Sequence, residues 1–353
     1  MHVITCEQVS SGHPDKLCDQ IADAIVTDVL TNDPSARVAA EVLIKGNQII
    51  IAGEIMSAFI PDYRALVREV FSRIGAERLG YDPDIFDIAL LMDRQSPDIA
   101  LGVDKGGAGD QGMMYGYATN ETPELLPIPY VLATDFLRIL ERHPSHMFRA
   151  DAKAQVSFDY DSGRITTFLC SVQHSPDVEP GDFRHVIESM MVLAAARLGL
   201  NTDFEKLVNP TGRFVLGGPF ADCGVTGRKL ACDTYGGVGR IGGGAMSGKD
   251  PTKVDRSGAY IARKIARDIV CAGYADRCEV QIAHAIGVAD PVSVYVDCFS
   301  TEKQSQEFIE SYVRENYDLT PRGIIEKLGL LDVDYNKVSS YGHFTRNDMP
   351  WEM

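Results

Sequence analysis

Residues 242–257 read GGGAMSGKDPTKVDRS, a glycine-rich loop that runs into the start of a helix. Glycines let a backbone approach a ligand closely, and N–H groups at a helix N-terminus attract anions. Lys249, Lys253 and Arg256 place positive charge where a polyphosphate would lie. The stretch therefore indicates a site for a phosphate-rich ligand, with a flexible surface turn as the simpler alternative.

A P-loop is the sharper rival for this stretch. Gly243, Gly248 and Lys249 fit the spacing G-x-x-x-x-G-K, but Asp250 stands where that motif needs a Ser or Thr hydroxyl for Mg²⁺. A P-loop also follows an apolar strand, whereas DTYGGVGRI precedes this loop. We therefore interpret the stretch as a polyphosphate cradle of another kind.

Length and composition limit the class of protein. With 353 residues, 45% of them hydrophobic and 24% charged, the chain has the size of two or three domains and an ordinary globular composition. The net charge of −16 argues against a nucleic-acid partner, and no apolar run is long enough to cross a membrane. Eight cysteines without C-x-x-C spacing, and no visible signal peptide, predict a cytoplasmic protein with reduced thiols.

The order helix, hairpin, helix occurs three times along the chain. Segments with helical spacing of apolar residues alternate with pairs of β-rich segments joined by short turns. In the first copy, Ser11 or Gly12 is expected to cap the helix, with Pro14 in its first turn. The expected elements are a helix from about 14, strands 36–45 and 48–55 and a helix 62–79; a helix 127–143, strands 151–160 and 165–174 and a helix 182–199; a helix 253–273, strands 278–288 and 292–299 and a helix 302–316.

This repeat predicts an α/β (α+β) fold of three structurally similar domains related by pseudo-threefold symmetry. Each domain is expected to be a mixed or antiparallel sheet covered by helices, because every hairpin has one face to bury. The expected domains are residues 1–98, 105–216 and 217–353, discontinuous and interleaved in space. Long irregular stretches join the repeats, and loops of that length in a compact enzyme usually carry function.

The motif GHPDK, at residues 12–16, places His13, Asp15 and Lys16 at the start of the first predicted helix. An imidazole, a carboxylate and an ammonium group at a helix N-terminus suit a phosphate and metal site. In that interpretation Asp15 binds Mg²⁺ while His13 and Lys16 contact phosphate oxygens. An ordinary helix cap with a solvated lysine is the alternative.

Other candidate residues are acids in turns and strands. Asp110 lies in the tight turn GAGDQG, where a turn-forming role alone would explain it. Glu41 and Glu54 lie on the two strands of the first predicted hairpin, among β-branched residues. Acids in such strands bind a cation or a partner, or else lie at a solvated edge, and the sequence leaves both open.

Basic residues gather in the second hairpin and in the irregular stretch before the glycine loop, against the acidic character of the chain. A triphosphate needs such cations, and a purine needs an aromatic face and a few polar contacts. Each basic residue alone suits a solvated surface, but the group favours a nucleotide site. The residues concerned are Asp151, Lys153, Arg213, Phe214, Asp222, Arg228 and Lys229.

Taken in order, several long motifs resemble those of the S-adenosylmethionine synthetases (methionine adenosyltransferases) of bacterial type. They are GHPDK, Gly53-Glu54, QSPDI at 95–99, GAGDQG at 107–112, DAK at 151–153, NPTGRFVLGGP at 209–219, DCGVTGRK at 222–229 and the stretch 242–257. The resemblance covers nearly the whole chain, to YGHF and PWE near its end. It implies the three-domain fold given above and a homodimer with active sites at the subunit interface, usually paired into a tetramer.

The resemblance implies that ATP, L-methionine and water give S-adenosylmethionine, phosphate and diphosphate, with two Mg²⁺ per site and K⁺. The methionine sulfur attacks C5′ of ATP and displaces tripolyphosphate, which the same site hydrolyses. Because the thioether loses no proton, this chemistry needs no general base. It needs alignment of sulfur, carbon and leaving oxygen, and cations where negative charge grows.

The resemblance also implies a role for individual residues. Those implied as catalytic are His13, Lys153, Arg228, Lys229, Lys249 and Lys253. Those implied to bind ATP are His13, Asp151, Lys153, Arg213, Phe214, Asp222, Arg228, Lys229, Ala245 and Lys249. Those implied to bind methionine are Glu54, Gln95, Asp110, Asp222 and Lys253. The implied metal ligands are Asp15 and Asp255 for Mg²⁺ and Glu41 for K⁺.

Three features depart from the usual pattern of the family. The segment between Gln95 and Gly107, the gating loop of the family, is shorter than in the common bacterial form. Met246 stands where Phe is usual, and the sequence ends at PWEM without the usual basic tail. Two alternatives to the adenosyltransferase are a catalytically impaired nucleotide-binding paralogue and another ATP-dependent phosphohydrolase.

Overall fold

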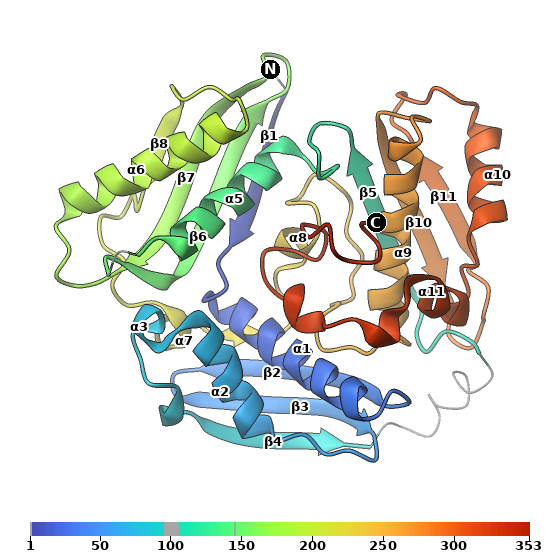
Figure 1. The fold of residues 1–353 in the computed structure, drawn as a ribbon, viewed down its shortest axis with the longest axis horizontal. Coiled ribbons are helices and arrows are strands. Elements are labelled where there is room, and N and C mark those ends of the chain that lie inside the picture. The colour runs from blue at the N-terminus through green and yellow to red at the C-terminus, as the bar shows by residue number, and fades with distance from the viewer. Residues whose placement is uncertain (1, 95–105, 145) are drawn as a thin grey trace.

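Three sheets organise the chain. The computed structural model describes residues 2–94, 106–144 and 146–353. The strand orders are β4-β3-β2-β9, β1-β6-β7-β8 and β11-β10-β5. Figure 1 shows the three sheet units around a centre that holds α8 (Leu230–Asp233) and the C-terminal segment. Each unit has the order helix, hairpin, helix, so the predicted α/β fold of three similar units is confirmed.

The first unit contains α1 (Pro14–Asn32), β2 (Arg37–Lys45), β3 (Gln48–Met56) and α2 (Tyr63–Ile74). β4 (Asp87–Asp93) runs parallel to β3, and β9 (Gly224–Val225) pairs with β2 from far along the chain. Alternate residues of β2 are buried, since one face of the sheet packs against α1. The apolar stripe of α1, which includes Leu17 and Ile21, is fully buried there.

Two details of this unit differ from the sequence prediction. The N-cap of α1 is His13, not Ser11 or Gly12. The helix predicted over 62–79 ends at Ile74, and a separate short helix, α3 (Ala76–Leu79), follows it. The break lies at Gly75, whose φ of 92° belongs to the left-handed region that glycine tolerates and a continuing helix does not.

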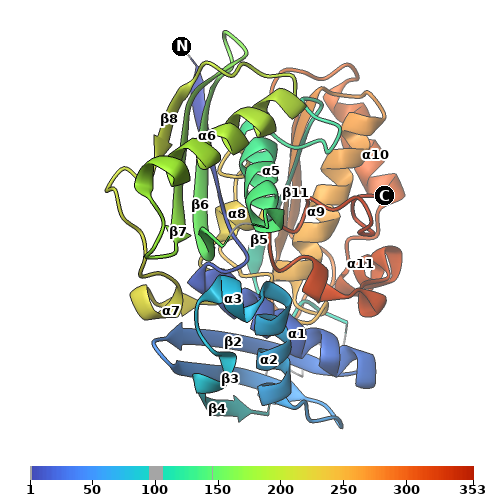
Figure 2. The ribbon, with the colours of Figure 1, turned by 60° about the vertical axis from the view of Figure 1, so that its left-hand side comes forward.

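The second unit contains α5 (Ile128–Arg142), β6 (Phe148–Asp159), β7 (Arg164–His174) and α6 (Pro180–Arg197). Its sheet gains β1 (Val3–Val9) on one edge and β8 (Glu205–Val208) on the other. β1 pairs antiparallel with β6, so that Val9 lies opposite Lys153. The N-terminal strand therefore completes the second sheet, and the chain enters α1 directly from that sheet (Figure 2).

The third unit contains α9 (Val254–Cys271), β10 (Arg277–His284), β11 (Ser293–Asp297) and α10 (Gln306–Asn316). β5 (Gly112–Thr119) pairs with β10, and α9 packs on β5. Both strands of this hairpin are shorter than predicted, and α10 begins at Gln306 rather than near Glu302. Ser305 caps that helix by accepting a hydrogen bond from the N–H of Phe308.

The remaining helices are short, and the C-terminal segment fills the centre. They are η1 (Pro83–Ile85), α7 (Gly218–Ala221), α11 (Pro321–Leu328), η2 (Leu330–Asp332) and η3 (Tyr335–Lys337). The Trp351 ring stacks on Tyr260 of α9 with centroids 3.7 Å apart. Glu352 forms a buried ion pair with Arg263 of the same helix. Among the described residues, no helix is both long and apolar enough to cross a membrane.

Candidate active site

His13 lies between β1 of the second sheet and the first residue of α1, Pro14. Its Nδ1 accepts a hydrogen bond of 3.1 Å from the N–H of Asp15, so the neutral ring carries its proton on Nε2. Burial, together with the charges of Lys229 and Lys153, lowers the pKa of His13 to about 3. The imidazole is therefore uncharged at neutral pH, and its Nε2–H can donate to a ligand.

Asp15, two residues later, is buried and surrounded by donors. Its carboxylate accepts hydrogen bonds from Lys229 Nζ at 2.7 Å and from the N–H of Val225 at 2.9 Å, and Arg228 Nε lies 3.2 Å away. Burial alone would raise the pKa of Asp15, but these hydrogen bonds outweigh it and hold the pKa below its ordinary value. The DCGVTGRK segment is thus fixed against the start of α1.

A stripe of three aspartates on α1 anchors the surrounding loops. Asp15, Asp19 and Asp23 are spaced four residues apart, so they lie on one face of the helix, and all are fully buried. Each accepts a backbone hydrogen bond of 2.8–2.9 Å, from Val225, Gly227 and Gly248 respectively. The sequence prediction missed Asp19 and Asp23, although an aspartate at every fourth position of an apolar helix was a usable signal.

The predicted role of Lys16 is wrong. Its side chain is 1% exposed, and Nζ donates to Asp19 at 2.9 Å and to Asp233 at 2.5 Å. A buried ammonium group held by two carboxylates is not available to phosphate oxygens. Lys16 instead ties α1 to α8, and the GHPDK motif presents only His13 and Asp15 toward the neighbouring loops.

Six residues predicted to bind the nucleotide or methionine line one cavity of about 320 Å³: His13, Asp151, Lys153, Arg213, Phe214 and Asp222. They come from α1, from β6 and from the irregular stretch before the glycine loop. The Phe214 backbone is held by His174, through hydrogen bonds of 3.1 and 2.9 Å. Asp151 accepts a hydrogen bond from the N–H of Gly218, and burial raises its pKa to about 6. We call the six predicted residues that line this cavity, together with Asp15, Arg228 and Lys229, the His13 cluster.

The glycine loop lies along β2. The N–H of Ala40 donates to the carbonyl of Gly248 at 2.8 Å, and Lys249 bridges to Ala39. A Cβ on Gly248 would lie 2.0 Å from the Ala40 carbonyl oxygen, and the φ of Gly248 is +83°, so only glycine fits. Asp250, where a P-loop has its hydroxyl, is buried and accepts a hydrogen bond from the N–H of Val38. This residue anchors the loop to the sheet.

The lysines of the loop are paired with carboxylates. Lys249 Nζ lies 2.6 Å from Asp255 Oδ2, and Lys253 Nζ lies 2.5 Å from Asp250 Oδ2. Both lysine side chains remain about one-fifth exposed, at 22% and 19%. We call Lys249, Lys253 and Asp255 the Lys249 cluster.

The sequence analysis expected Arg256 to place positive charge beside a polyphosphate. That expectation is wrong, because Arg256 is not accessible to a ligand. It is fully buried, pairs with Asp23, and donates from Nε to the carbonyl of Met246 at 2.6 Å. Its guanidinium group also lies over the ring of Tyr335, 4.2 Å from the centroid. Arg256 and Asp23 together hold Met246 and Gly248, on either side of Ser247, in the glycine loop.

The two clusters meet where Gly227 packs against Ala245. A Cβ on Gly227 would lie 2.4 Å from Ala245 Cβ, so the glycine loop lies directly against the segment that carries Arg228 and Lys229. Among the described residues, no hydrogen bond or ion pair joins a side chain of the His13 cluster to one of the Lys249 cluster. They are neighbours with separate side-chain networks.

Of the other predicted residues, Glu54 lies near the Lys249 cluster, Glu41 and Asp110 are exposed, and Gln95 lies outside the described chain. Glu54 on β3 is opposite Ala39, the residue that bridges to Lys249. Glu41 on β2 is exposed, and Asp110 is exposed in its turn, where its carboxylate accepts the N–H of Gln111 at 2.7 Å. Gln95 lies outside the described residues, as does most of the shortened segment that follows it.

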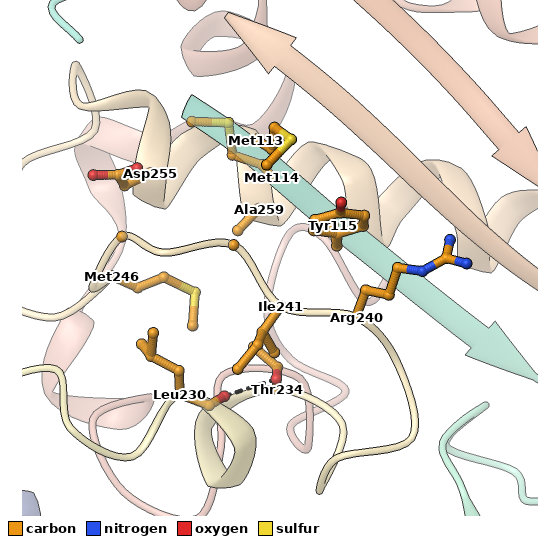
Figure 3. Close-up of a pocket in the computed structure, with 12 residues that line it drawn as sticks. Met113, Met114, Tyr115, Leu230, Thr234, Arg240, Ile241, Met246, Asp255 and Ala259 are labelled. Carbon is orange, nitrogen blue, oxygen red and sulfur yellow. Dashed lines mark hydrogen bonds between the residues drawn. The ribbon is translucent and has the colours of Figure 1, made fainter. Parts of the chain in front are cut away.

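A small apolar cavity of about 30 Å³ lies beneath the glycine loop (Figure 3). Its lining includes Met113 and Met114 of β5, Leu230 of α8, and Met246 and Asp255. The unbranched side chain of Met246 adapts to irregular gaps, whereas the Phe usual in the family would fill more of this space. Asp255 therefore lines this small cavity and also contacts Lys249 through its Oδ2.

The described residues contain no group of three or more His, Cys, Asp or Glu side chains arranged to hold a metal ion. Mg²⁺ does not require such a cage, because it usually keeps several waters and binds one or two carboxylates together with phosphate oxygens. Asp255 suits that mode, since among the described residues only its Oδ2 accepts a hydrogen bond. Asp15 suits it only when the Lys229 ammonium group moves away from Oδ2.

Comparison with known proteins identifies the family of this chain. Family models for the N-terminal, central and C-terminal domains of S-adenosylmethionine synthetase match residues 1–97, 105–214 and 216–353. A solved structure described as an unusual S-adenosylmethionine synthetase from Campylobacter jejuni is similar to this chain, with 36% identity and a TM-score of 0.92. The similarity covers 100% of this chain and 97% of that one. The chain therefore belongs to the S-adenosylmethionine synthetase family, the methionine adenosyltransferases.

Proposed function

We propose that this protein makes S-adenosylmethionine from ATP and L-methionine in two steps at one site. In the first step the methionine sulfur attacks C5′ of ATP, the C5′–O bond breaks, and tripolyphosphate leaves. In the second step water hydrolyses the tripolyphosphate to phosphate and diphosphate. The observation that carries this proposal is the cavity in which a neutral, buried His13 lies with Lys153 and Arg213 beside an aromatic side chain.

In this proposal the His13 cluster holds the nucleotide. The Nε2–H of His13 donates to the oxygen that leaves C5′, where negative charge grows in the transition state. Lys153, Arg228 and Lys229 stabilise the phosphate oxygens, and Phe214 provides a face for the adenine. A charged imidazole would be costly to bury, so the lowered pKa of His13 supports a hydrogen-bond donor that stays neutral and transfers no proton.

The Lys249 cluster completes the site. The proposed roles are phosphate contact for Lys249, and contact with phosphate and methionine for Lys253. Because each ammonium group is paired with a carboxylate, we expect a bound polyphosphate to take over these cations and free the carboxylates. Glu54, Gln95, Asp110 and Asp222 are proposed to hold methionine, with carboxylates near its ammonium group and near the sulfonium that forms.

We propose that Asp15 and Asp255 hold two Mg²⁺ per site and that Glu41 holds K⁺. When bound, the divalent ions neutralise charge on the phosphates. The carboxylate of Asp255 supports this most directly, since its Oδ1 accepts no hydrogen bond from any described residue. Release of Asp255 by Lys249 would then couple phosphate binding to metal binding within one loop.

We further propose a cytoplasmic homodimer with its active sites at the subunit interface, and a tetramer formed by two such dimers. Two features support the dimer. The His13 and Lys249 clusters have separate side-chain networks, as expected if each completes a site with the partner's opposite cluster. The sheets also expose large apolar side chains, including Leu91 of β4, Met113 of β5 and Tyr295 of β11, at 53–63% exposure.

The test follows ATP consumption by the purified protein with and without methionine, Mg²⁺ and K⁺. Phosphate, diphosphate and S-adenosylmethionine are measured together. We expect release of all three only when methionine is present. Phosphate release that is indifferent to methionine would identify a phosphohydrolase instead, and ATP binding without any turnover would identify an impaired paralogue. Multi-angle light scattering on the same sample gives the oligomeric state.

A further inference from the structure

A second polar cavity, of about 370 Å³, lies between α5 and the C-terminal residues 340–348. It shares no lining residue with the cavity of the His13 cluster. Three of its eight lining residues are arginines, Arg138, Arg142 and Arg346, in a chain whose net charge is −16. The hydroxyl groups of Tyr341 and Thr345 lie in the same wall. We call it the arginine cavity.

Two of the three arginines of the cavity have no carboxylate partner among the described residues. Arg138 is the exception, since it forms an ion pair with Asp135 at 3.9 Å and donates to the hydroxyl of Thr345 at 2.8 Å. Among the described residues, no carboxylate lies within ion-pair distance of Arg142 or Arg346, and the buried Nε of Arg346 has no hydrogen-bond partner. Burial lowers the pKa of Arg138, Asp135 opposes that shift, and the charge of Arg346 adds to it, so the two arginines lie close enough to repel each other.

Neither of the two acids in the lining forms an ion pair with one of the three arginines, among the described residues. Glu141 accepts a hydrogen bond from the hydroxyl of Ser11 and, through its carbonyl, one of 2.5 Å from Arg78. Asp348 lies 3.7 Å from Lys337. A group with two or more negative charges would satisfy the free guanidinium donors, which match planar carboxylates and phosphates.

The arginine cavity also borders the loop that carries His13. Ser11 is bound to Glu141 of the cavity wall, and its N–H lies 3.5 Å from the hydroxyl of Tyr341. Both partners line the cavity, and Ser11 precedes His13 by two residues. A ligand that contacts Arg142 or Arg346 would change the field around Glu141 and so act on the start of α1.

We propose that the arginine cavity binds a small polyanion, a polycarboxylate or an organic bisphosphate, and that its occupancy changes the affinity of the His13 cluster for ATP. The binding site stands independently of the proposed reaction. The coupling rests on the proposed nucleotide site. By linkage, ATP changes the affinity for the polyanion by the same factor.

Citrate binding to the intact protein, measured by calorimetry without ATP or methionine, tests the site. The variant is R142Q/R346Q, which leaves the Arg138–Thr345 contact in place. R314Q on α10 is the matched control, because Arg314 is 67% exposed and lies far along the chain. We expect citrate binding to weaken at least tenfold in R142Q/R346Q and to be unchanged in R314Q.

Two results would overturn the site. One is citrate affinity that R142Q/R346Q leaves unchanged. The other is citrate binding that R213Q, in the cavity of the His13 cluster, abolishes, because the anion would then occupy the nucleotide site. Circular dichroism and thermal melting check that each variant is folded, and the single variant R142Q replaces the double one if the latter does not fold.

The coupling is tested by the dissociation constant for ATP, measured without methionine at fixed free Mg²⁺, with and without citrate. We expect citrate to change that constant at least threefold in the wild type and in R314Q, but not in R142Q/R346Q. Chelation of Mg²⁺ by citrate would affect all three proteins alike. A constant that citrate does not change in the wild type overturns the coupling, whereas failure of the proposed reaction would appear separately, as absent methionine-dependent turnover.

Discussion

The His13 cluster and the Lys249 cluster differ in how many of their charged groups are left open. In the first, six side chains line an open cavity, and the ion pairs among the described residues are confined to Asp15, which holds Lys229 at 2.7 Å and Arg228 at 3.2 Å. In the second, the cations are closed onto neighbouring carboxylates at 2.5–2.6 Å. Most of the first cluster is therefore open to a ligand, with Lys229–Asp15 as its internal ion pair, whereas both lysines of the second cluster must exchange a carboxylate for the ligand.

The aspartate stripe of α1 is what the two clusters have in common. Asp15 and Asp19 hold the segment of the His13 cluster, and Asp23 holds the glycine loop. One helix thus positions both clusters of the chain. The comparison suggests that loss of the shared support is more damaging than loss of either cluster's own contacts.

The largest effect is expected for Asp23→Asn. This change leaves the fully buried Arg256 without its carboxylate, and breaking a buried pair costs about 3–5 kcal/mol. Urea unfolding measures the loss of stability, with Asp28→Asn on the same helix as control. The double variant D23L/R256M should recover much of the stability but not the turnover, because the glycine loop loses its anchors. Full turnover in the double variant would contradict the positioning role.

Removal of one lysine from each cluster compares them directly. We expect Lys229→Met and Lys249→Met each to lower kcat about 10²–10³-fold, the usual loss for a donor to developing charge. Asp15 can bind Mg²⁺ only after Lys229 leaves its Oδ2, whereas Asp255 keeps an Oδ1 that accepts no hydrogen bond from any described residue. Removal of Lys229 should therefore change the concentration of Mg²⁺ required for half-maximal rate more than removal of Lys249 does. Lys206→Met on β8 is the control. Equal Mg²⁺ dependence in both variants would remove the distinction between the clusters.

Asp250→Ser gives the glycine loop the hydroxyl of a P-loop. We expect a loss of about 1–3 kcal/mol in stability, because the buried N–H of Val38 loses its acceptor and Lys253 its partner. ATP hydrolysis in the absence of methionine should not increase. Denaturant unfolding and phosphate release measure the two effects. An unchanged stability would show that the loop does not depend on this anchor.

The last prediction, which appears only as a change with pH, is a pH dependence specific to His13. Its folded pKa of about 3 lies below the ordinary value near 6.5, so the unfolded chain binds more protons between these values, and folding stability rises with pH there. From pH 4.5 to 6.5 the difference in unfolding free energy between wild type and His13→Asn should increase by about 2 kcal/mol. Asp151, whose pKa is raised to about 6, acts in the opposite direction, and its effect cancels in this difference. If the difference in unfolding free energy did not change with pH, the pKa of His13 in the folded protein would not be lowered.

Local patterns in the sequence were sufficient for the repeated units. Helical spacing and β-rich pairs predicted the order helix, hairpin, helix three times, because these periodicities follow from which face of each element is buried. The predicted N-cap of the first helix and the predicted end of the second helix were wrong. Gly75 and His13 changed the expected boundaries, since caps depend on the φ of single residues and on one side-chain hydrogen bond.

The sequence by itself determined the three units, the glycine loop and the residue types of the proposed polyphosphate site. Only the tertiary structure decided which of the predicted cations are left accessible to a ligand. Lys16 and Arg256 appeared equivalent to Lys249 in the sequence, yet both are buried against aspartates of α1 or α8. The reason is physical: whether a charge is solvated or paired depends on groups more than 200 residues away, such as Asp233 for Lys16 and Asp23 for Arg256. Periodicity in a single segment carries no information about such partners.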